Sequence, residues 1–143
     1  MANLFSRGKT IIGLHIRRGD YNDYKGTNKQ VFFFIAPSAW YKSWLSSIWS
    51  IVPDPVLFMA SDEIDVAASE FSEYHPVTVQ DLYSPLPDNY FYPDFYLLSQ
   101  CDMLAISNST FSFAASMLNN KAKSFLRPVL HLKRLIPYDP WAS

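Results

Sequence analysis

Two short runs in which almost every residue is apolar constrain the fold of this chain most: TIIGLHI at residues 10–16 and PVLFMAS at residues 55–61. Strands without polar alternation are buried on both faces, which is typical of a parallel sheet covered by helices. The sequence predicts further strands at residues 75–80, 102–108 and 123–130, the last before a polar tail that contains proline. Between the strands it predicts helices at residues 37–50, 62–71, 93–100 and 109–119.

This alternation predicts one α/β domain over residues 1–143: a Rossmann-like parallel sheet with helices on both faces. A chain of 143 residues, of which 49% are hydrophobic, can bury a core without disulfides or metals. It contains one cysteine, Cys101, which lies in an apolar segment and is expected to be a small buried residue. No internal repeat or linker divides the chain.

The charge balance argues against a nucleic-acid-binding protein. Twelve basic and 13 acidic residues give a formal net charge of −1, so no broad positive field is expected and an anion site must be local. No apolar run approaches the ~18 residues of a transmembrane helix, and the first residues lack the apolar core of a secretory signal. We therefore expect a cytoplasmic chain without a transmembrane segment, peripheral at most to a membrane.

In such sheets ligands bind beyond the carboxyl ends of the strands, and the first of these ends carries paired arginines. Arg17 and Arg18 follow the strand that ends in His15-Ile16, with Asp20 two residues further on. Two adjacent guanidinium groups repel each other but match the oxygens of a diphosphate or a carboxylate. The alternative is that all three are exposed loop residues.

Two other strand ends carry polar groups, and for each of them helix capping is an alternative to ligand binding. Asp62 follows the second strand and, with Glu63, suits either the binding of a metal–phosphate unit or the capped first turn of a helix. Ser109 and Thr110 stand between a strand and a helix, where hydroxyl and backbone N–H groups hold anions or cap the helix. Only four glycines occur, which excludes glycine-rich phosphate loops, and the three histidines lack metal-ligand spacing.

Three motifs in order resemble signatures of the α1,2-fucosyltransferase family. HIRRGDY at residues 15–21 is similar to the family's first signature, HxRRGDY. FMASDE at residues 58–63 resembles the second, and PDFYLLSQCD at 93–102 with ISNSTFSFAA at 106–115 resembles the third. Together they cover about residues 11 to 120.

The resemblance implies the donor-binding half of a GT-B glycosyltransferase that transfers L-fucose from GDP-fucose to a glycan hydroxyl with inversion. It implies no cofactor and no obligatory metal, so that Arg17 and Arg18 neutralise the leaving diphosphate. Arg17, Arg18 and Asp20 are then the expected catalytic residues, although no general base is assigned. The expected donor-binding residues are His15 and Asp94 at the guanine, Ser109 and Thr110 at phosphate, Asp62 close to the nucleotide, and the two arginines.

The resemblance implies a further α/β half before the first signature, and because this signature begins at residue 15 we expect that half to be absent from the chain. We therefore expect a chain that binds the donor and performs or assists transfer, with a partner chain as one source of the missing acceptor-binding half. The alternative is a non-catalytic module that binds a nucleotide sugar, a glycan or a protein and has kept the fold.

Overall fold

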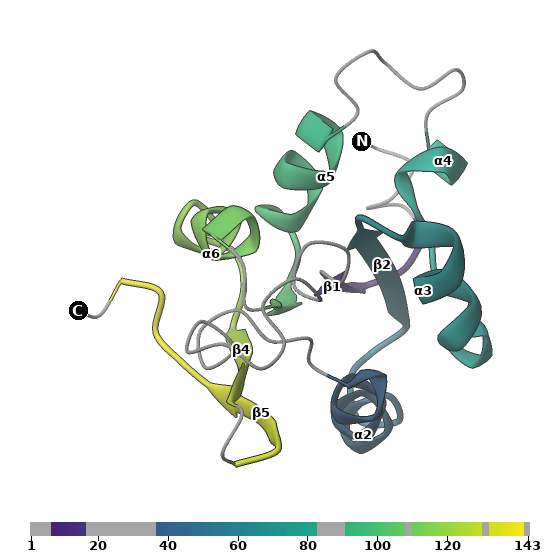
Figure 1. Ribbon diagram of the computed structural model, residues 1–143, viewed down its shortest axis with the longest axis horizontal. Helices are drawn as coiled ribbons and strands as arrows, with labels where there is room; N and C mark the ends of the chain where they lie inside the picture. The colour runs from purple at the N-terminus through teal and green to yellow at the C-terminus, as the bar shows by residue number, and fades with distance from the viewer. Residues whose placement is uncertain (1–6, 17–36, 83–90, 108–109, 130–131, 142–143) are drawn as a thin grey trace, which may run out of the picture.

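The computed structural model describes residues 7–16, 37–82, 91–107, 110–129 and 132–141 (Figure 1). Its strands form one five-stranded sheet in the order β2-β1-β3-β4-β5. The strands are β1 (Thr10–Ile16), β2 (Pro55–Ser61), β3 (Met103–Ala105), β4 (Ser124–Val129) and β5 (Arg134–Pro137). The helices are α2 (Ser38–Ile48), α3 (Ile64–Glu70), α4 (Val79–Leu82), α5 (Phe91–Leu98) and α6 (Thr110–Met117), with a 3₁₀ turn at Ser72–Tyr74.

Four strands run parallel, as the apolar runs predict. β1 pairs with β2 along its whole length, from Thr10 opposite Pro55 to Ile16 opposite Ser61. On its other side β1 pairs with β3, which in turn pairs with β4. The predicted α/β class is therefore confirmed.

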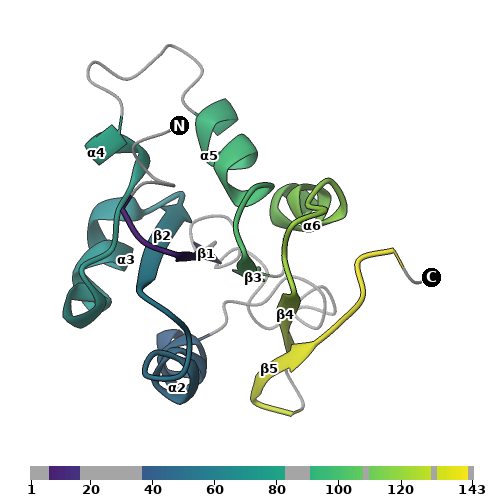
Figure 2. The same ribbon diagram turned by 180° about the vertical axis from the view of Figure 1, so that it is seen from behind.

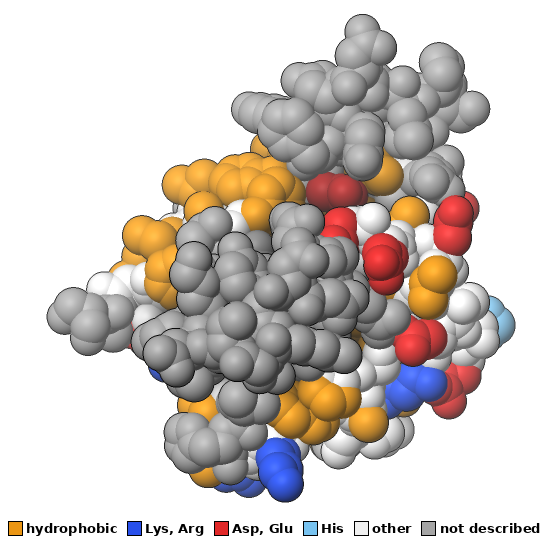
Figure 3. All heavy atoms as spheres, viewed as in Figure 1, with side chains coloured by type: hydrophobic (Ala, Val, Ile, Leu, Met, Phe, Trp, Pro, Cys, Tyr) orange, Lys and Arg blue, Asp and Glu red, His pale blue; other side chains and the backbone are white. Residues whose placement is uncertain are grey.

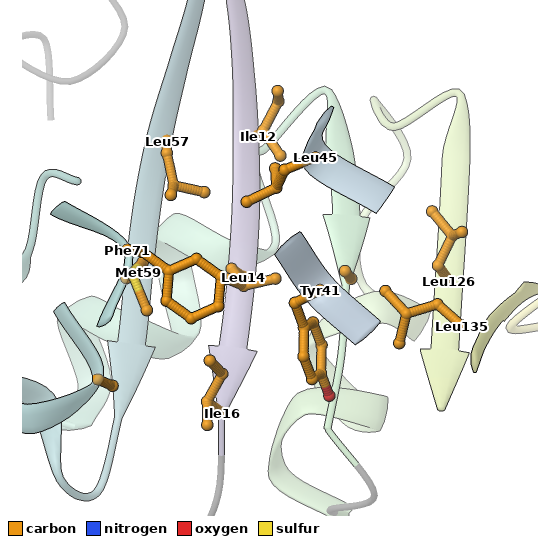
Figure 4. Packing of buried hydrophobic residues seen from close by; sticks show 12 residues of the cluster. Ile12, Leu14, Ile16, Tyr41, Leu45, Leu57, Met59, Phe71, Leu126 and Leu135 are labelled. Carbon is orange, nitrogen blue, oxygen red and sulfur yellow. The ribbon is translucent and has the colours of Figure 1, made fainter. Parts of the chain in front are cut away.

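Helices cover both faces of the sheet, and each face has its own apolar cluster. Ile12, Leu14 and Ile16 of β1 point to the face covered by α2 and α3, where they pack with Tyr41 and Phe71 (Figure 4). The opposite face carries α5 and α6, and its cluster includes Ile11, Leu97, Leu98 and Ala115. Figures 1 and 2 show the two pairs of helices on opposite sides of the strands.

The predicted strand at residues 75–80 is wrong. Only Val77 forms a bridge there, parallel to Phe58 at the outer edge of β2. Thr78 then begins a helix: the Asp81 carboxylate accepts hydrogen bonds from its backbone N–H at 2.8 Å and from its hydroxyl at 3.2 Å. This side-chain cap favours helix α4 over continued pairing.

The tail after β4 is a strand, which the sequence analysis did not predict. β5 pairs antiparallel with β4, with Leu126 opposite Pro137 and Val129 opposite Arg134. The sheet is therefore mixed at this edge. Cys101 is fully buried as expected, and burial raises the pKa of its thiol, so that it remains protonated and inert.

Candidate functional site

The order of the strands reverses beside β1, and in open α/β sheets the carboxyl end of the strand at such a point is where ligands bind. The chain passes from β1 to β2 on one side and later returns to β3 on the other side. Loops that leave two such neighbouring strands in opposite directions open a crevice at the strands' carboxyl ends. His15 lies near this end of β1, and Ser107 follows β3 by two residues.

His15 is held in place inside this edge of the sheet. Its side chain is buried, and Nδ1 lies 2.7 Å from the hydroxyl oxygen of Ser107. Its ring packs against Phe111 with 5.2 Å between centroids, and Phe111 meets Phe95 edge-on at 5.4 Å. The imidazole therefore has a fixed orientation, since β1 carries it, Phe111 of α6 packs against it with Phe95 of α5 behind, and Ser107 holds one nitrogen.

A second buried hydroxyl fixes the start of α6. Ser112 donates to the backbone carbonyl of Ser107 at 3.3 Å, and the two hydroxyl oxygens lie 3.5 Å apart. Thr110 is the first residue of α6, as the expected anion-binding position requires, although its side chain and all of Ser109 lie outside the described residues. Ser107 and Ser112 thus tie the carboxyl end of β3 to α6.

Asp94 stands in the first turn of α5. The α5 helix ends at the opposite, amino edge of the sheet, because Asp102 just beyond it accepts a hydrogen bond from the backbone N–H of Ile11. Its first turn therefore points towards the carboxyl edge that carries His15. Oδ1 of Asp94 is buried without a hydrogen-bond partner, and burial raises the pKa of this carboxyl from 3.8 to about 7.

An unpaired buried carboxylate oxygen is costly, because water no longer solvates it and no donor replaces water. Such atoms are rare in native proteins and call for an explanation, of which a missing ligand is one. Asp94 therefore offers an acceptor to an N–H or O–H group of a bound molecule.

Asp62 occupies the turn between β2 and α3 and is exposed. Glu63, not Asp62, stands at the N-cap of α3, and its side chain makes no capping hydrogen bond there. Instead the hydroxyl of Ser61 accepts a hydrogen bond from the backbone N–H of Glu63 at 3.0 Å. Asp62 is therefore not the N-cap of α3, which was the alternative to a ligand-binding role. It lies at the carboxyl end of β2, the strand beside β1.

Of the predicted site residues, the structure thus describes His15, Asp62 and Asp94 at this edge, with Thr110 placed by its backbone. Arg17, Arg18, Asp20 and Ser109 lie outside the described residues. Within the described ranges no group of three or more His, Cys, Asp or Glu residues could hold a metal ion.

Sequence reasoning missed the two buried serines and the aromatic pair that support His15. It assigned the hydroxyls of Ser109 and Thr110 to phosphate, but Ser107 in the same motif is the residue that contacts the histidine. Ser107 and Ser112 flank the start of α6, and nothing in their spacing indicates that both hydroxyls turn inward. Phe95 and Phe111 occur in the quoted motifs, yet only the fold shows that they meet.

A family model for glycosyl transferase family 11 matches residues 1–128. The chain belongs to this family. Over 110 residues it is 30% identical to the O-antigen biosynthesis glycosyltransferase WbnK of Escherichia coli, an alignment that covers 74% of the chain and 33% of WbnK. The resemblance to the fucosyltransferase signatures is therefore confirmed at the level of the family.

A solved structure shares the fold. It is the NodZ α-1,6-fucosyltransferase soaked with GDP-fucose, which matches this member of family 11 with a TM-score of 0.57 at 13% sequence identity. The match covers 96% of the chain and 46% of NodZ. The chain therefore spans a third of the length of WbnK and less than half the length of NodZ. In its described part no helix combines the length and apolar character needed to cross a membrane.

Proposed function

We propose that this chain binds GDP-fucose at the carboxyl ends of β1 and β3 and serves as the donor-binding part of a fucosyltransferase. The observation that carries the proposal is the buried, unpartnered Oδ1 atom of Asp94 in the first turn of α5. Family membership supports a glycosyltransferase, and the GDP-fucose named for the NodZ structure supports the choice of donor.

Guanine fits the needs of Asp94 because it carries two adjacent donors, N1–H and the exocyclic amine. A carboxylate that accepts both forms charge-assisted hydrogen bonds, which are stronger than those between neutral groups. Binding would therefore ionise Asp94 and replace the missing water. Phe95 and Phe111 add an apolar surface beside His15, as a base-binding pocket requires.

In the proposed reaction an acceptor hydroxyl attacks the anomeric carbon of fucose. The new C–O bond forms on the face opposite the breaking bond to the diphosphate, which leaves as GDP with the electron pair, so the configuration inverts. Arg17 and Arg18 neutralise the charge that develops on the diphosphate, so that no metal is needed. A carboxylate takes the proton of the hydroxyl, and Asp20 is the candidate from the same motif.

Calorimetric titration with three nucleotides tests the donor site. GDP is expected to bind, IDP to bind more weakly because hypoxanthine lacks the exocyclic amine, and ADP to bind weakest because adenine has no N1–H. Loss of one charge-assisted hydrogen bond corresponds to about tenfold or more in affinity. Equal binding of GDP and ADP would contradict the proposed role of Asp94, and EDTA is expected to change nothing.

Two variants separate the base from the phosphate site. Asp94→Asn keeps the size of the side chain but turns donors towards the donors of guanine, so GDP affinity should fall while affinity for ADP stays low. Arg17→Ala should weaken all three diphosphates alike. Asp65→Asn, which removes one carboxylate from an exposed position on α3, is the matched control and should bind GDP like the wild type.

The second candidate function is binding of the nucleotide sugar without transfer. It rests on the same observation, because the unpartnered Oδ1 atom of Asp94 bears on binding of the donor and not on transfer. Release of GDP from GDP-fucose in the presence of glycan acceptors, with and without a supplied acceptor-binding half, distinguishes the two. Binding with no turnover in either case would support the second candidate.

A further inference from the structure

The charges of this chain are separated across the sheet. Ten of the 13 acidic residues fall between residues 43 and 120, a stretch without lysine or arginine. Five basic residues and one acidic residue follow it: Lys121, Lys123, Arg127, Lys133, Arg134 and Asp139. In Figure 3 acidic side chains gather over α3 and α4, and basic side chains lie at the lower edge, where Figure 1 shows β5. The β4–β5 edge is therefore a local positive surface.

An open groove follows α2 beside this positive edge. It consists of two hollows of about 350 Å³ each that share Trp44. The first lies between α2 and β5, and its lining includes Trp40, Ser43, Ser47, Lys133 and Arg134. The second continues towards the amino ends of β3 and β4, where Lys123 and Tyr138 line it. We call the two hollows together the α2 groove.

The packing of α2 explains why tryptophans border the groove. Tyr41 and Leu45 are fully buried against the sheet, and the Tyr41 hydroxyl donates to the carbonyl of Ile106 at 3.0 Å. The neighbouring stripe of Trp40, Trp44 and Ile48 is only half-buried and lies at the margin of the core. The helix is thus anchored by one stripe and presents indole surface along the next.

We propose that the α2 groove binds an acidic oligosaccharide. The rings of Trp40 and Trp44 offer flat apolar surface for the C–H faces of sugar rings, and indole and serine groups offer hydrogen bonds to hydroxyls. Lys133 and Arg134 at one end and Lys123 at the other supply donors for carboxylates. Both cations of the first pair are exposed, so that they reach a ligand that enters from solvent.

An acidic oligosaccharide fits this groove better than an acidic peptide. Peptides that dock as helices need a continuous apolar surface, and those that add to a sheet pair with a free strand edge. β5 is the last strand of the sheet, but the α2 groove lies on the sheet face that α2 covers, so a ligand in it would meet side chains and not the edge of β5. The groove instead combines two aromatic side chains with two serines and a pair of cations. None of these residues belongs to the donor site, so this proposal goes beyond the proposed function and does not depend on it.

Titration with three probes of similar length tests the proposal: tetragalacturonate, the neutral maltotetraose, and a tetraglutamate peptide. Tetragalacturonate is expected to bind and to change the tryptophan fluorescence, and the other two are expected to bind at least about tenfold more weakly, a difference of roughly 1.4 kcal/mol. Equal binding of tetraglutamate would overturn the choice of a carbohydrate. Equal binding of maltotetraose would overturn the role of the cations.

Variants locate the site. The double variant Lys133→Glu/Arg134→Glu should lose about tenfold or more in affinity, since two attractive charges become repulsive. Arg7→Glu/Lys9→Glu changes the net charge equally at two exposed residues beside the amino end of β1 and should bind like the wild type. Unchanged binding in the first double variant, or equal loss in both, would contradict the proposal.

Trp44→Leu tests the aromatic contact while it keeps an apolar side chain against the core. It should weaken tetragalacturonate binding but leave GDP binding unchanged, because Trp44 is not at the donor edge. If this variant does not fold, the two charge variants still decide the question. Every sample is also titrated with GDP, so that a wrong proposal for the α2 groove can be distinguished from a wrong proposal for the donor site.

Discussion

The Nδ1 atom of His15 lies 2.7 Å from the Oγ atom of Ser107, although 92 positions separate the two residues in sequence. This contact joins the carboxyl end of β1 to the segment that follows β3, across the point where the strand order reverses. Both side chains are buried. The contact therefore holds together the two strand ends between which the donor is proposed to bind.

Ser107→Ala should destabilise the fold and loosen His15. The substitution leaves a buried imidazole nitrogen without this partner, which costs about 1–3 kcal/mol in unfolding free energy. Urea unfolding measures the loss, and nitrogen chemical shifts of the His15 ring report its changed hydrogen bonding. The control is Ser47→Ala, which removes an exposed hydroxyl that donates only within α2. Equal unfolding midpoints for wild type and Ser107→Ala would show that the contact contributes nothing.

Asp94 should make the stability of the free chain fall as pH rises. Its pKa is raised from 3.8 to about 7 by burial, so between these values the folded chain holds a proton that the unfolded chain releases. The unfolding free energy contributed by Asp94 therefore decreases by at most about 1.4 kcal/mol per pH unit in this window and is constant above it. The difference between wild type and Asp94→Asn, measured by urea unfolding from pH 4 to pH 8, isolates this slope.

Affinity for GDP-fucose should show the opposite trend with pH. Guanine donors favour the ionised carboxylate, which is the minor form below the raised pKa of about 7. Affinity should therefore rise about tenfold between pH 6 and pH 8 and level off above. GDP-fucose suits this test because its diphosphate is esterified at both ends and does not titrate near neutrality. A pH-independent affinity, or the same rise in Asp94→Asn, would exclude Asp94 as the titrating group.

Gly13→Ala should destabilise the chain by overpacking. A Cβ atom at residue 13 would lie 2.7 Å from the sulfur of Cys101 and 3.1 Å from Cδ1 of Leu104. Both neighbours are fully buried, so the expected cost is about 1–3 kcal/mol. Cys101→Ala removes the nearest atom. The double variant should therefore lose less unfolding free energy than the two single variants lose together. Additive losses would show that the sulfur is not the obstacle.

The sequence predicted the parts of the fold that depend on local pattern. β2 was predicted with its observed bounds, and the helix after Pro37 was found because its apolar residues repeat at helical spacing. The strand predicted at 75–80 failed because a side-chain contact, from Asp81 back to Thr78, decides where α4 begins. β5 was missed because a short strand depends on its partner β4 more than on its own sequence.

The sequence predicted only those site residues that belong to the motifs. His15, Asp62 and Asp94 were named from motif positions, and the parallel sheet brings them to one edge. Sequence alone could not show that Oδ1 of Asp94 is buried and unpartnered, since this depends on how α5 packs on β1 and β2. The same holds for Ser107, whose partner lies on a different strand.

Asn119 connects the end of helix α5 to the segment that follows helix α6. Its buried side-chain amide donates to the carbonyls of Leu98 and Cys101, both at 3.0 Å, and its carbonyl oxygen accepts from the backbone N–H groups of Lys121 and Ala122. It thus ties the end of α5 to the segment between α6 and β4, far from the carboxyl edge of the sheet.

Asn119→Asp should therefore be strongly destabilising. It replaces the two amide donors with an oxygen that faces two carbonyl oxygens, at a cost on the order of 2–4 kcal/mol in unfolding free energy. The loss should shrink at low pH, where the new carboxyl is protonated and can donate again to one carbonyl. The neighbouring exposed Asn120→Asp changes the charge equally and should unfold within about 0.5 kcal/mol of the wild type. Equal destabilisation of the two variants would mean that added charge, not the broken network, weakens the chain.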